Sequence, residues 1–347
     1  MKNIPISKKL ILYPQDSIIS AMKKLNEGSL RFQLVVDMDK RLLGTISDGD
    51  IRRAILEGID LEAPVTKCMN SKPTVSYINN ENEHKSVLYS IPAVIKYLPV
   101  LDVDKLLKYV LIDEEQIINK TALIMAGGFG KRLGNKTKKT PKPLLKIGNE
   151  SILELLLKKL EKVNYSTVYI STYYLHEKIE SYIKKRDSKI NIKLLVEKSP
   201  MGTAGCINLI PRDEYESLTV INGDIVSEVD FDALNTFHME KKNDITLTVA
   251  KYNHQVPFGV VTFDKNYTFN SVNEKPVLSH YVLSGIYCLN KSICNLVRNE
   301  KIDMTTIITK SQKLDKKIGI FPIHEYWKDI GNLDDYAIAS KRNEKKS

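Results

Sequence analysis

The feature that most constrains the fold is a glycine-rich turn directly after a short apolar run. Residues 122–126 read Ala-Leu-Ile-Met-Ala, which is typical of a strand buried in a sheet. The turn itself, residues 127–130, reads Gly-Gly-Phe-Gly and is followed by Lys131, Arg132 and Lys142. Glycines let the backbone turn sharply and bring its N–H groups close to a ligand, and cations beside such a turn suit a polyphosphate. The sequence therefore predicts a phosphate-binding loop at the carboxyl end of a strand.

Two common phosphate loops do not fit this turn. The Walker pattern requires Lys and Ser or Thr directly after its second glycine, and that pattern is missing. The dinucleotide fingerprint requires a third glycine one position earlier than Gly134, and a later acidic residue that is also missing. A glycine turn beside solvated lysines, with no ligand, is the remaining structural alternative.

The loop and the Pro-Lys-Pro that follows it at 141–143 resemble the signature of the sugar-1-phosphate nucleotidyltransferases. The resemblance covers about residues 119–340 and does not depend on the loop alone. Later segments match the family's motifs in the family's order: Glu197 with Gly202-Thr203-Ala204-Gly205, Asn222-Gly223-Asp224, Pro257-Phe258-Gly259, Glu274-Lys275-Pro276, Ser284-Gly285-Ile286-Tyr287 and Trp327-Lys328-Asp329-Ile330-Gly331. The segments Gly134-Asn135-Lys136-Thr137 and Asn332-Leu333 depart from the family pattern, but both lie beside the motifs rather than in them.

The resemblance implies a role for each matching residue. Arg132 would hold the leaving phosphates, Lys142 would bridge the α-phosphate and the sugar phosphate, and Lys275 would anchor the sugar phosphate. The resemblance also implies the residues that bind each ligand. The nucleotide would bind at Ala126, Gly127, Gly128, Gly130, Glu197, Gly202 and Thr203. The sugar would bind at Gly259, Glu274 and Gly285, and Mg²⁺ at Asp224 and Asp329.

The expected reaction is attack of a sugar 1-phosphate on the α-phosphorus of a nucleoside triphosphate, with pyrophosphate leaving. A phosphate monoester is largely ionised near neutral pH, so no general base is required. Glu197 favours GTP, because a carboxylate accepts hydrogen bonds and guanine offers two donors. An enzyme that uses UTP or dTTP with glucose or N-acetylglucosamine 1-phosphate is the alternative. A nucleotide sensor that binds without turnover is the alternative from another class.

The first 118 residues contain a weak internal repeat with a shift of 65 positions. Val36-Asp37 matches Leu101-Asp102, and Asp48 matches Asp113. The segment at 35–56 resembles a cystathionine-β-synthase-type (CBS) repeat, which implies an adenine nucleotide on Thr45, Asp48 and Asp113. The second repeat has lost the small and hydroxyl residues of the first, so a pure scaffold is the alternative. A CBS pair before such a transferase domain resembles the glucosamine-1-phosphate guanylyltransferases of bacterial legionaminic acid synthesis.

Composition and charge agree with two domains, a CBS pair at 1–118 and a nucleotidyltransferase domain at 119–347. Residues 1–118 carry 16 basic and 16 acidic side chains, so the net charge of +10 falls on the second domain, which suits anionic substrates. Neither a nucleic-acid motif nor an apolar run long enough to span a membrane is present. Four cysteines without paired spacing indicate reduced thiols and a cytoplasmic protein, and CBS pairs commonly form homo-oligomers.

The predicted fold class is α/β, with an α+β CBS pair ahead of a Rossmann-like, mixed and mostly parallel sheet. Apolar runs predict strands at 167–171, 192–196 and 218–221. Helices are expected at 152–163 and 177–185, the first opened by a capping box of Ser151 and Glu154. Repeated strand–helix units place ligands at the carboxyl ends of the strands.

Overall fold

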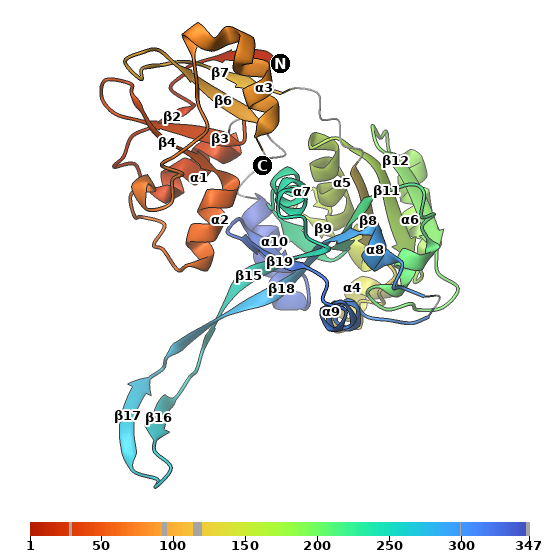
Figure 1. Cartoon of the computed structure of the whole chain (residues 1–347). Helices are drawn as coiled ribbons and strands as arrows, with labels where there is room; N and C mark the ends of the chain where they lie inside the picture. The colour runs from red at the N-terminus through yellow and green to blue at the C-terminus, as the bar shows by residue number, and fades with distance from the viewer. Residues whose placement is uncertain (28–29, 92–95, 114–119, 299, 345–347) are drawn as a thin grey trace.

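Our computed structural model describes residues 1–27, 30–91, 96–113, 120–298 and 300–344. Within these ranges the chain forms an N-terminal unit and a larger unit that follows it (Figure 1). The expected linker at 113–120 and the boundary at 118 fall on residues 114–119, which lie outside the described residues. None of the helices in the described ranges combines the length and apolar character that a membrane crossing requires.

The N-terminal unit is built from two small sheets with three helices. One sheet has the order β2 (Ile11–Leu12), β3 (Phe32–Val36), β4 (Leu42–Ser47). The other has the order β1 (Lys2–Pro5), β7 (Leu107–Ile112), β6 (Tyr97–Leu101), β5 (Ser76–Tyr77). The helices are α1 (Ile18–Glu27), α2 (Asp48–Leu56) and α3 (Glu81–Ser90), with short 3₁₀ turns at Val65–Lys67 and Ile78–Asn80.

The internal repeat is visible as two hairpins with the same turn. In the first, the Asp37 carboxylate accepts hydrogen bonds from the backbone N–H groups of residues 39 and 41. In the second, the Asp102 carboxylate accepts from those of residues 104 and 106. Lys40 and Lys105 take the same left-handed conformation, with φ of 65° and 63°. The shift of 65 positions in the sequence therefore corresponds to a repeated β-hairpin.

The larger unit is organised by a seven-stranded sheet. Its strand order is β12 (Asn191–Val196), β11 (Tyr165–Thr172), β8 (Lys120–Met125), β13 (Ser217–Asn222), β18 (Val277–Asn290), β15 (Ile245–Gln255), β19 (Ile318–Ile323). Only β18 runs antiparallel to its neighbours among these strands. The predicted α/β class with a mixed, mostly parallel sheet is confirmed.

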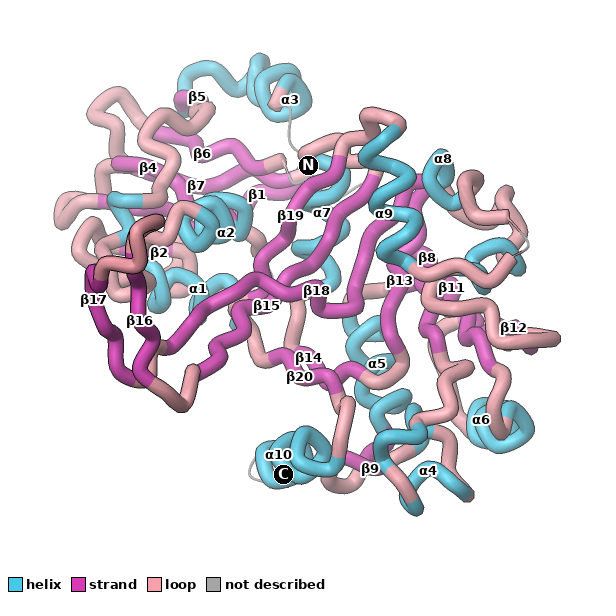
Figure 2. The backbone as a smooth tube through the Cα atoms, turned by 90° about the horizontal axis from the view of Figure 1, so that it is seen from below, coloured by secondary structure: helices cyan, strands magenta, loops and turns pink. Residues whose placement is uncertain are grey.

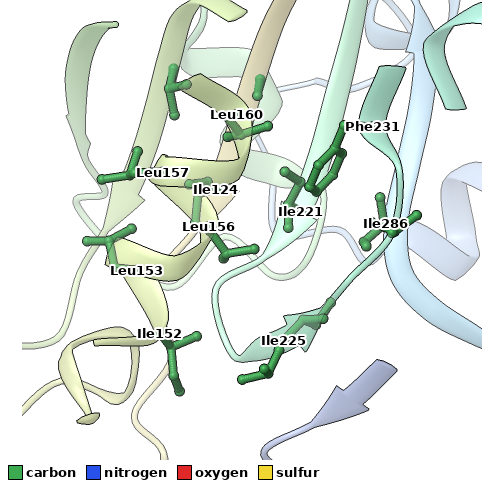
Figure 3. Packing of buried hydrophobic residues seen from close by; sticks show 14 of the residues in the cluster. Ile124, Ile152, Leu153, Leu156, Leu157, Leu160, Ile221, Ile225, Phe231 and Ile286 are labelled. Carbon is green, nitrogen blue, oxygen red and sulfur yellow. The ribbon is translucent and has the colours of Figure 1, made fainter. Parts of the chain in front are cut away.

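Helices cover both faces of this sheet, which explains why its strands are apolar on both sides. The helix α5 (Ile152–Lys162) is capped by Ser151, whose hydroxyl accepts from the Glu154 N–H at 3.1 Å. Leu153, Leu156, Leu157 and Leu160 recur at helical spacing and pack toward Ile124, Ile221 and Phe231 (Figure 3).

Further elements complete this unit. The helices are α4 (Asn135–Lys138), α6 (His176–Lys185), α7 (Phe231–Glu240), α8 (Lys291–Cys294), α9 (Met304–Lys313) and α10 (Leu333–Glu344), with 3₁₀ turns at Lys131–Leu133, Lys142–Leu144 and Gly205–Leu209. Two small ladders pair β9 (Lys146–Ile147) with β10 (Glu150–Ser151) and β14 (Ile225–Ser227) with β20 (Trp327–Asp329).

The two units contact each other through ion pairs, one buried and the others partly exposed. Arg52 on α2 is 1% exposed, lies over the Phe321 ring and pairs with Glu325 at 3.2 Å. A second contact joins Arg31 to Asp230 and Asp232 at the start of α7. The N-terminal unit is therefore anchored next to β19 and β20 of the larger unit.

A long two-stranded arm leaves the larger unit. β15 pairs with β19 only as far as Ala250, and beyond that point it continues with β18 alone. The far end of the arm is the hairpin of β16 (Gly259–Phe263) and β17 (Phe269–Glu274). Figures 1 and 2 show this hairpin projecting away from the body of the molecule.

Candidate active site

The glycine turn follows β8 and is held at both ends. The Ala126 N–H donates to the Ser171 carbonyl at 2.7 Å, which ties the start of the turn to β11. Gly130 has a φ of 63°, and a Cβ at this position would lie 2.8 Å from Thr137 Cγ2. The Thr137 hydroxyl also donates to the Gly130 carbonyl at 2.9 Å. Glycine is therefore required at position 130, both for its conformation and for its space.

A cavity of about 270 Å³ opens beside this turn, at the carboxyl ends of β8 and β13. It collects most of the residues that the sequence assigned to the nucleotide and the reacting phosphates. The predicted residues that line it are Ala126, Gly127, Gly128, Lys142, Glu197, Gly202, Thr203 and Asp224. Parallel strands end at one edge of a sheet, so loops far apart in the sequence meet there.

Glu197 faces the cavity from the end of β12 and is 7% exposed. One carboxylate oxygen accepts from the Ser171 hydroxyl at 2.6 Å, and the other accepts from the Met201 N–H at 2.9 Å. Each carboxylate oxygen can accept a second hydrogen bond. A Cβ on Gly127 would lie 2.9 Å from the Glu197 carboxylate, so glycine leaves room for this side chain.

Gly202 and Thr203 pack closely against the start of α9. Gly202 has a φ of 77°, and a Cβ there would lie 2.6 Å from the Ile302 carbonyl. The N–H and hydroxyl of Thr203 donate to the Asp303 carboxylate at 3.0 and 3.2 Å, and the hydroxyl accepts from the Met304 N–H. Thr203 thus shapes the cavity wall, and its hydroxyl is already used within the protein.

The two aspartates come together through the β14–β20 ladder. Ile225 is the partner of Asp329 in this ladder, and the Ile330 N–H donates to the Asp224 carbonyl at 3.0 Å. Lys142, which is 8% exposed, lies between the two carboxylates, with its ammonium 2.5 Å from Asp224 and 3.9 Å from Asp329. A buried cation and two carboxylates therefore meet at the edge of the cavity.

The surroundings of Asp329 fit a bound cation. Burial, and then the neighbouring Asp224 carboxylate, raise the pKa of Asp329 above its usual range. Its Oδ1 atom is buried without a hydrogen-bond partner. The described residues contain no cluster of three or more metal-ligating side chains. Two carboxylates alone suit an ion such as Mg²⁺, which takes most of its oxygen ligands from phosphates and water.

Arg132 and Gly285 lie next to the cavity but do not line it. A Cβ built on Gly331 would lie 3.6 Å from the Arg132 guanidinium and 3.7 Å from the Asp329 carboxylate, so Arg132 is near the aspartates. Gly285 has a φ of 77°, and a Cβ there would lie 2.5 Å from the Asn222 amide. Any side chain at position 285 would therefore displace Asn222.

Six side chains that line the cavity have no role among the sequence predictions: Met125, Phe129, Pro143, Pro200, Met201 and Asn222. Asn222 is the most informative, because its Oδ1 atom is buried without a hydrogen-bond partner. Its position at the end of β13, directly before Gly223-Asp224, was the signal that could have identified it.

The structure does not bring the expected sugar-phosphate residues to this cavity within one chain. Gly259, Glu274 and Lys275 lie on the arm, and Figures 1 and 2 both place the arm apart from α4 and the glycine turn. The reason is that β15 and β18 pair with each other beyond the edge of the sheet instead of folding back. Only Gly285 of the predicted sugar residues stays near the cavity.

The residues expected to bind a nucleotide in the N-terminal unit have hydrogen-bond partners within the protein. Thr45 is fully buried, and its hydroxyl accepts from Tyr97 at 3.2 Å. Both carboxylate oxygens of Asp48 accept from Arg52, at 2.5 and 3.1 Å. A cavity of about 300 Å³ between Asp48 and helix α7 does not include Asp113, which lies beside Tyr89 instead. Asp113, from the second repeat, therefore lies outside the cavity at Asp48, and a nucleotide on these residues stays a prediction.

Two family models match different parts of the chain. The family described as nucleotidyl transferase matches residues 121–346, and the CBS domain family matches residues 1–57. D-glycero-alpha-D-manno-heptose 1-phosphate guanylyltransferase from Aneurinibacillus thermoaerophilus is 33% identical over 225 residues, which cover 63% of this chain and 96% of that protein. Mannose-1-phosphate guanyltransferase from Schizosaccharomyces pombe is 30% identical over 224 residues, which cover 62% of each chain.

A solved structure has a fold similar to that of this chain. HddC from Yersinia pseudotuberculosis, in complex with GMP-PN, matches 65% of this chain and 99% of its own length, with a TM-score of 0.52 and 25% identity. The family match extends over more than half of the chain and includes all the residues of the cavity. The chain therefore belongs to the nucleotidyl transferase family and carries a CBS domain at its N-terminus.

Proposed function

We propose that the protein transfers a guanylyl group from GTP to a sugar 1-phosphate, giving a GDP-sugar and pyrophosphate. The observation that carries this proposal is the single cavity where the glycine turn, Lys142, Glu197 and Asp224 meet. The relatives named above are guanylyltransferases of a heptose and a mannose 1-phosphate, which supports both the reaction and the base.

The nucleotide is proposed to lie along the cavity from the 197–203 segment to the glycine turn. Glu197 would accept hydrogen bonds from the guanine, using the acceptor capacity that Ser171 and Met201 leave open. The turn would offer backbone N–H groups to the triphosphate, and Arg132 would neutralise the leaving pyrophosphate.

Lys142 is proposed as the cation of the transition state. It is held at the junction of the cavity and the carboxylates by Asp224 and Asp329, so it needs little reorganisation when negative charge develops on the α-phosphate. The sugar phosphate is already ionised near neutral pH, so the protein positions this nucleophile and has no proton to remove from it.

Magnesium is proposed to bind between Asp224 and Asp329. The Oδ1 atom of Asp329 has no hydrogen-bond partner and lies 3.9 Å from the Lys142 ammonium, and the pKa of Asp329 is raised; both support this assignment, since a divalent cation would relieve both. When bound, the ion would neutralise phosphate charge, with its remaining ligands taken from the substrates and water.

Three sugar 1-phosphates are candidate substrates, and experiment must choose between them. Glucosamine 1-phosphate follows from the resemblance of the CBS-transferase combination to the enzymes of legionaminic acid synthesis. Mannose 1-phosphate and heptose 1-phosphate follow from the relatives. The corresponding role in the cell would be to supply a GDP-sugar for bacterial glycan synthesis.

The test is pyrophosphate release with GTP, UTP, dTTP, CTP and ATP, each combined with a panel of hexose, hexosamine and heptose 1-phosphates and Mg²⁺. We expect turnover with GTP and one sugar of the panel, and loss of turnover when EDTA removes the metal. A preference for UTP or dTTP would overturn the role of Glu197 in base selection. No turnover with any combination in the panel would favour a nucleotide sensor over an enzyme.

A further inference from the structure

The arm at residues 251–283 exposes an unusual amount of apolar surface. Beyond Ala250 it consists of two strands, and two-stranded ribbons are marginally stable in water unless something packs on them. Six large apolar side chains along it are between 57 and 86% exposed: Phe258, Phe263, Tyr267, Phe269, Val272 and Val277. Soluble proteins seldom leave a contiguous apolar surface of this kind uncovered.

The strand register shows that the hairpin at the end of the arm has two different faces. Gly259 is opposite Glu274, Val261 is opposite Val272, and Phe263 is opposite Phe269. Because side chains alternate along a strand, Gly259, Val261 and Phe263 share one face of β16, and Glu274 and Val272 lie opposite the first two; the register shifts by one residue before the pair of Phe263 and Phe269. The other face carries Val260 opposite Asn273 and Thr262 opposite Ser271, and the hydroxyls of Thr262 and Ser271 hydrogen-bond at 2.8 Å. The hairpin is thus amphipathic, and its apolar face ends in the Glu274 carboxylate.

The next residue, Lys275, is held at a sharp corner between the hairpin and the stem of the arm. Its φ is 49°, a left-handed conformation that non-glycine residues seldom adopt. The Lys275 N–H donates to the Phe258 carbonyl at 3.3 Å, and the Val256 N–H donates to the Pro276 carbonyl at 2.9 Å. Non-glycine residues held in such a conformation tend to occur where a protein needs the side chain in a particular place.

The cavity of the same chain lacks a basic side chain for the sugar phosphate, whereas the arm carries Lys275. Lys142 is the only basic side chain among the described residues that line it, and Lys142 already faces Asp224 and Asp329. Two phosphorylated substrates bring more negative charge than one lysine and the neighbouring Arg132 can balance. The proposed Mg²⁺ would neutralise part of this charge, but the described residues that line the cavity offer no second side-chain cation for the sugar phosphate, and the arm of this chain points elsewhere (Figures 1 and 2).

We propose that two copies of the chain exchange their arms, so that each arm packs its apolar face on the other copy and places Lys275 and Glu274 at that copy's cavity. Lys275 would bind the sugar phosphate and Glu274 a sugar hydroxyl, and this part rests on the proposed function. A second copy is favoured as the occupant because its acidic cavity edge complements the lysine, and because exchange of an identical element is a low-cost route to a dimer.

The decisive experiment combines two inactive variants. Asp224→Asn disables the cavity and keeps an intact arm, whereas Lys275→Ala disables the arm and keeps an intact cavity. Each variant alone should lose at least about 90% of turnover, on the scale of a lost phosphate contact. After co-expression we expect about a quarter of wild-type activity, because half of randomly paired dimers are mixed and each mixed dimer has one intact site.

The cis arrangement gives the opposite result. If each arm served its own cavity, every mixed dimer would hold two damaged sites, and activity would stay at the level of the separate variants. That outcome, obtained with an active wild-type protein, would overturn the exchange. The wild-type control separates the two proposals. If the proposed function were wrong, the wild type would also show no turnover; if only the arm exchange were wrong, the wild type would be active.

A second pair of variants tests the docking without relying on activity. Val261→Lys puts a charge on the apolar face, whereas Thr262→Lys puts the same charge on the polar face of the same strand. Sedimentation should show a dimer for the wild type and for Thr262→Lys, and a folded monomer for Val261→Lys. A wild-type monomer, or a Val261→Lys variant that stays dimeric, would overturn the proposal.

Discussion

Arg52 of the N-terminal unit donates to the Glu325 carboxylate of the transferase unit at 3.2 Å, in the segment that leads into β20 and Asp329. Both side chains are almost completely buried. Burial alone would raise the pKa of Glu325, but Arg52 and then His324 outweigh burial and hold that pKa below its ordinary value. The carboxylate therefore stays charged in the interface and depends on Arg52 as its partner.

Replacing Arg52 should weaken the whole protein. Arg52→Ala leaves Glu325 and Asp48 without their buried partner, and we expect the free energy of unfolding to fall by about 3 kcal/mol or more. Urea unfolding measures this loss. The matched control is Arg41→Ala, because Arg41 is 50% exposed, its partners Asp37 and Asp39 also reach solvent, and its loss should cost less than about 1 kcal/mol. Equal stability of the two variants would mean that the interface pair does not hold the units together.

Lys142 and Asp224 give the second prediction, which concerns turnover rather than stability. Lys142→Ala removes the buried ammonium at the cavity, and we expect kcat to fall by at least about a hundredfold, the scale of a lost preorganised charge. Asp224→Asn should lower kcat by a similar factor. The control is Lys146→Ala on β9, whose side chain is exposed. Turnover close to wild type in Lys142→Ala would remove that lysine from the mechanism.

Gly223 offers a test of the backbone geometry at the cavity. Its N–H donates to the Met125 carbonyl at 2.9 Å, and a Cβ would lie 2.5 Å from that carbonyl oxygen. Gly223→Ala should therefore push β13 away from β8, destabilise the protein by about 1–3 kcal/mol and lower kcat. Thermal unfolding and pyrophosphate release measure the two effects.

The control for this glycine is Gly49→Ala in α2, where the nearest atom to a new Cβ is 3.7 Å away. This substitution should be neutral or slightly stabilising, because alanine is the better helix former. If Gly223→Ala kept both the melting temperature and the kcat of the wild type, the contact between β13 and β8 would be looser than described.

The sequence was sufficient to predict the parts of the site that depend on local pattern. An apolar run before the glycine turn indicated β8, and the same pattern at 218–221 indicated β13. Parallel strands place their carboxyl ends together, so the turn and Asp224 could be expected in one place. Glu197, at the end of β12, follows the same rule.

The remaining features depend on contacts that no local pattern reveals. Asp48 resembles a ligand-binding carboxylate in sequence, but its partner Arg52 is fixed by Glu325 from a distant segment. In sequence, the strands of the arm look like ordinary half-buried strands. The alternation of apolar and polar residues indicates that one face of a strand is buried, but it does not indicate which chain buries it. The sequence therefore could not show that Glu274 and Lys275 lie on an arm that extends away from the cavity of their own chain, and their roles stay a prediction.

The last prediction concerns pH and an ion-pair cluster that packs α5 against the segment after α6. Arg186 hydrogen-bonds the Glu161 carboxylate and, as the largest influence, lowers the pKa of Glu161 to about 2. The folded pKa lies below the ordinary value of 4.5, so the stabilisation is complete above about pH 4.5 and is lost as the pH falls toward 2. We expect Glu161→Gln to cost about 2 kcal/mol of unfolding free energy at pH 7.

The difference between the wild type and Glu161→Gln should therefore shrink as the pH is lowered from 5 to about 3, because the wild-type carboxylate begins to be protonated in the unfolded state. Urea unfolding at a series of pH values measures this convergence. Glu177→Gln on α6 is the control, since that side chain is 71% exposed and its substitution should leave stability unchanged at every pH. A difference that stays constant across this range would show that packing of Glu161, rather than its charge, supports the cluster.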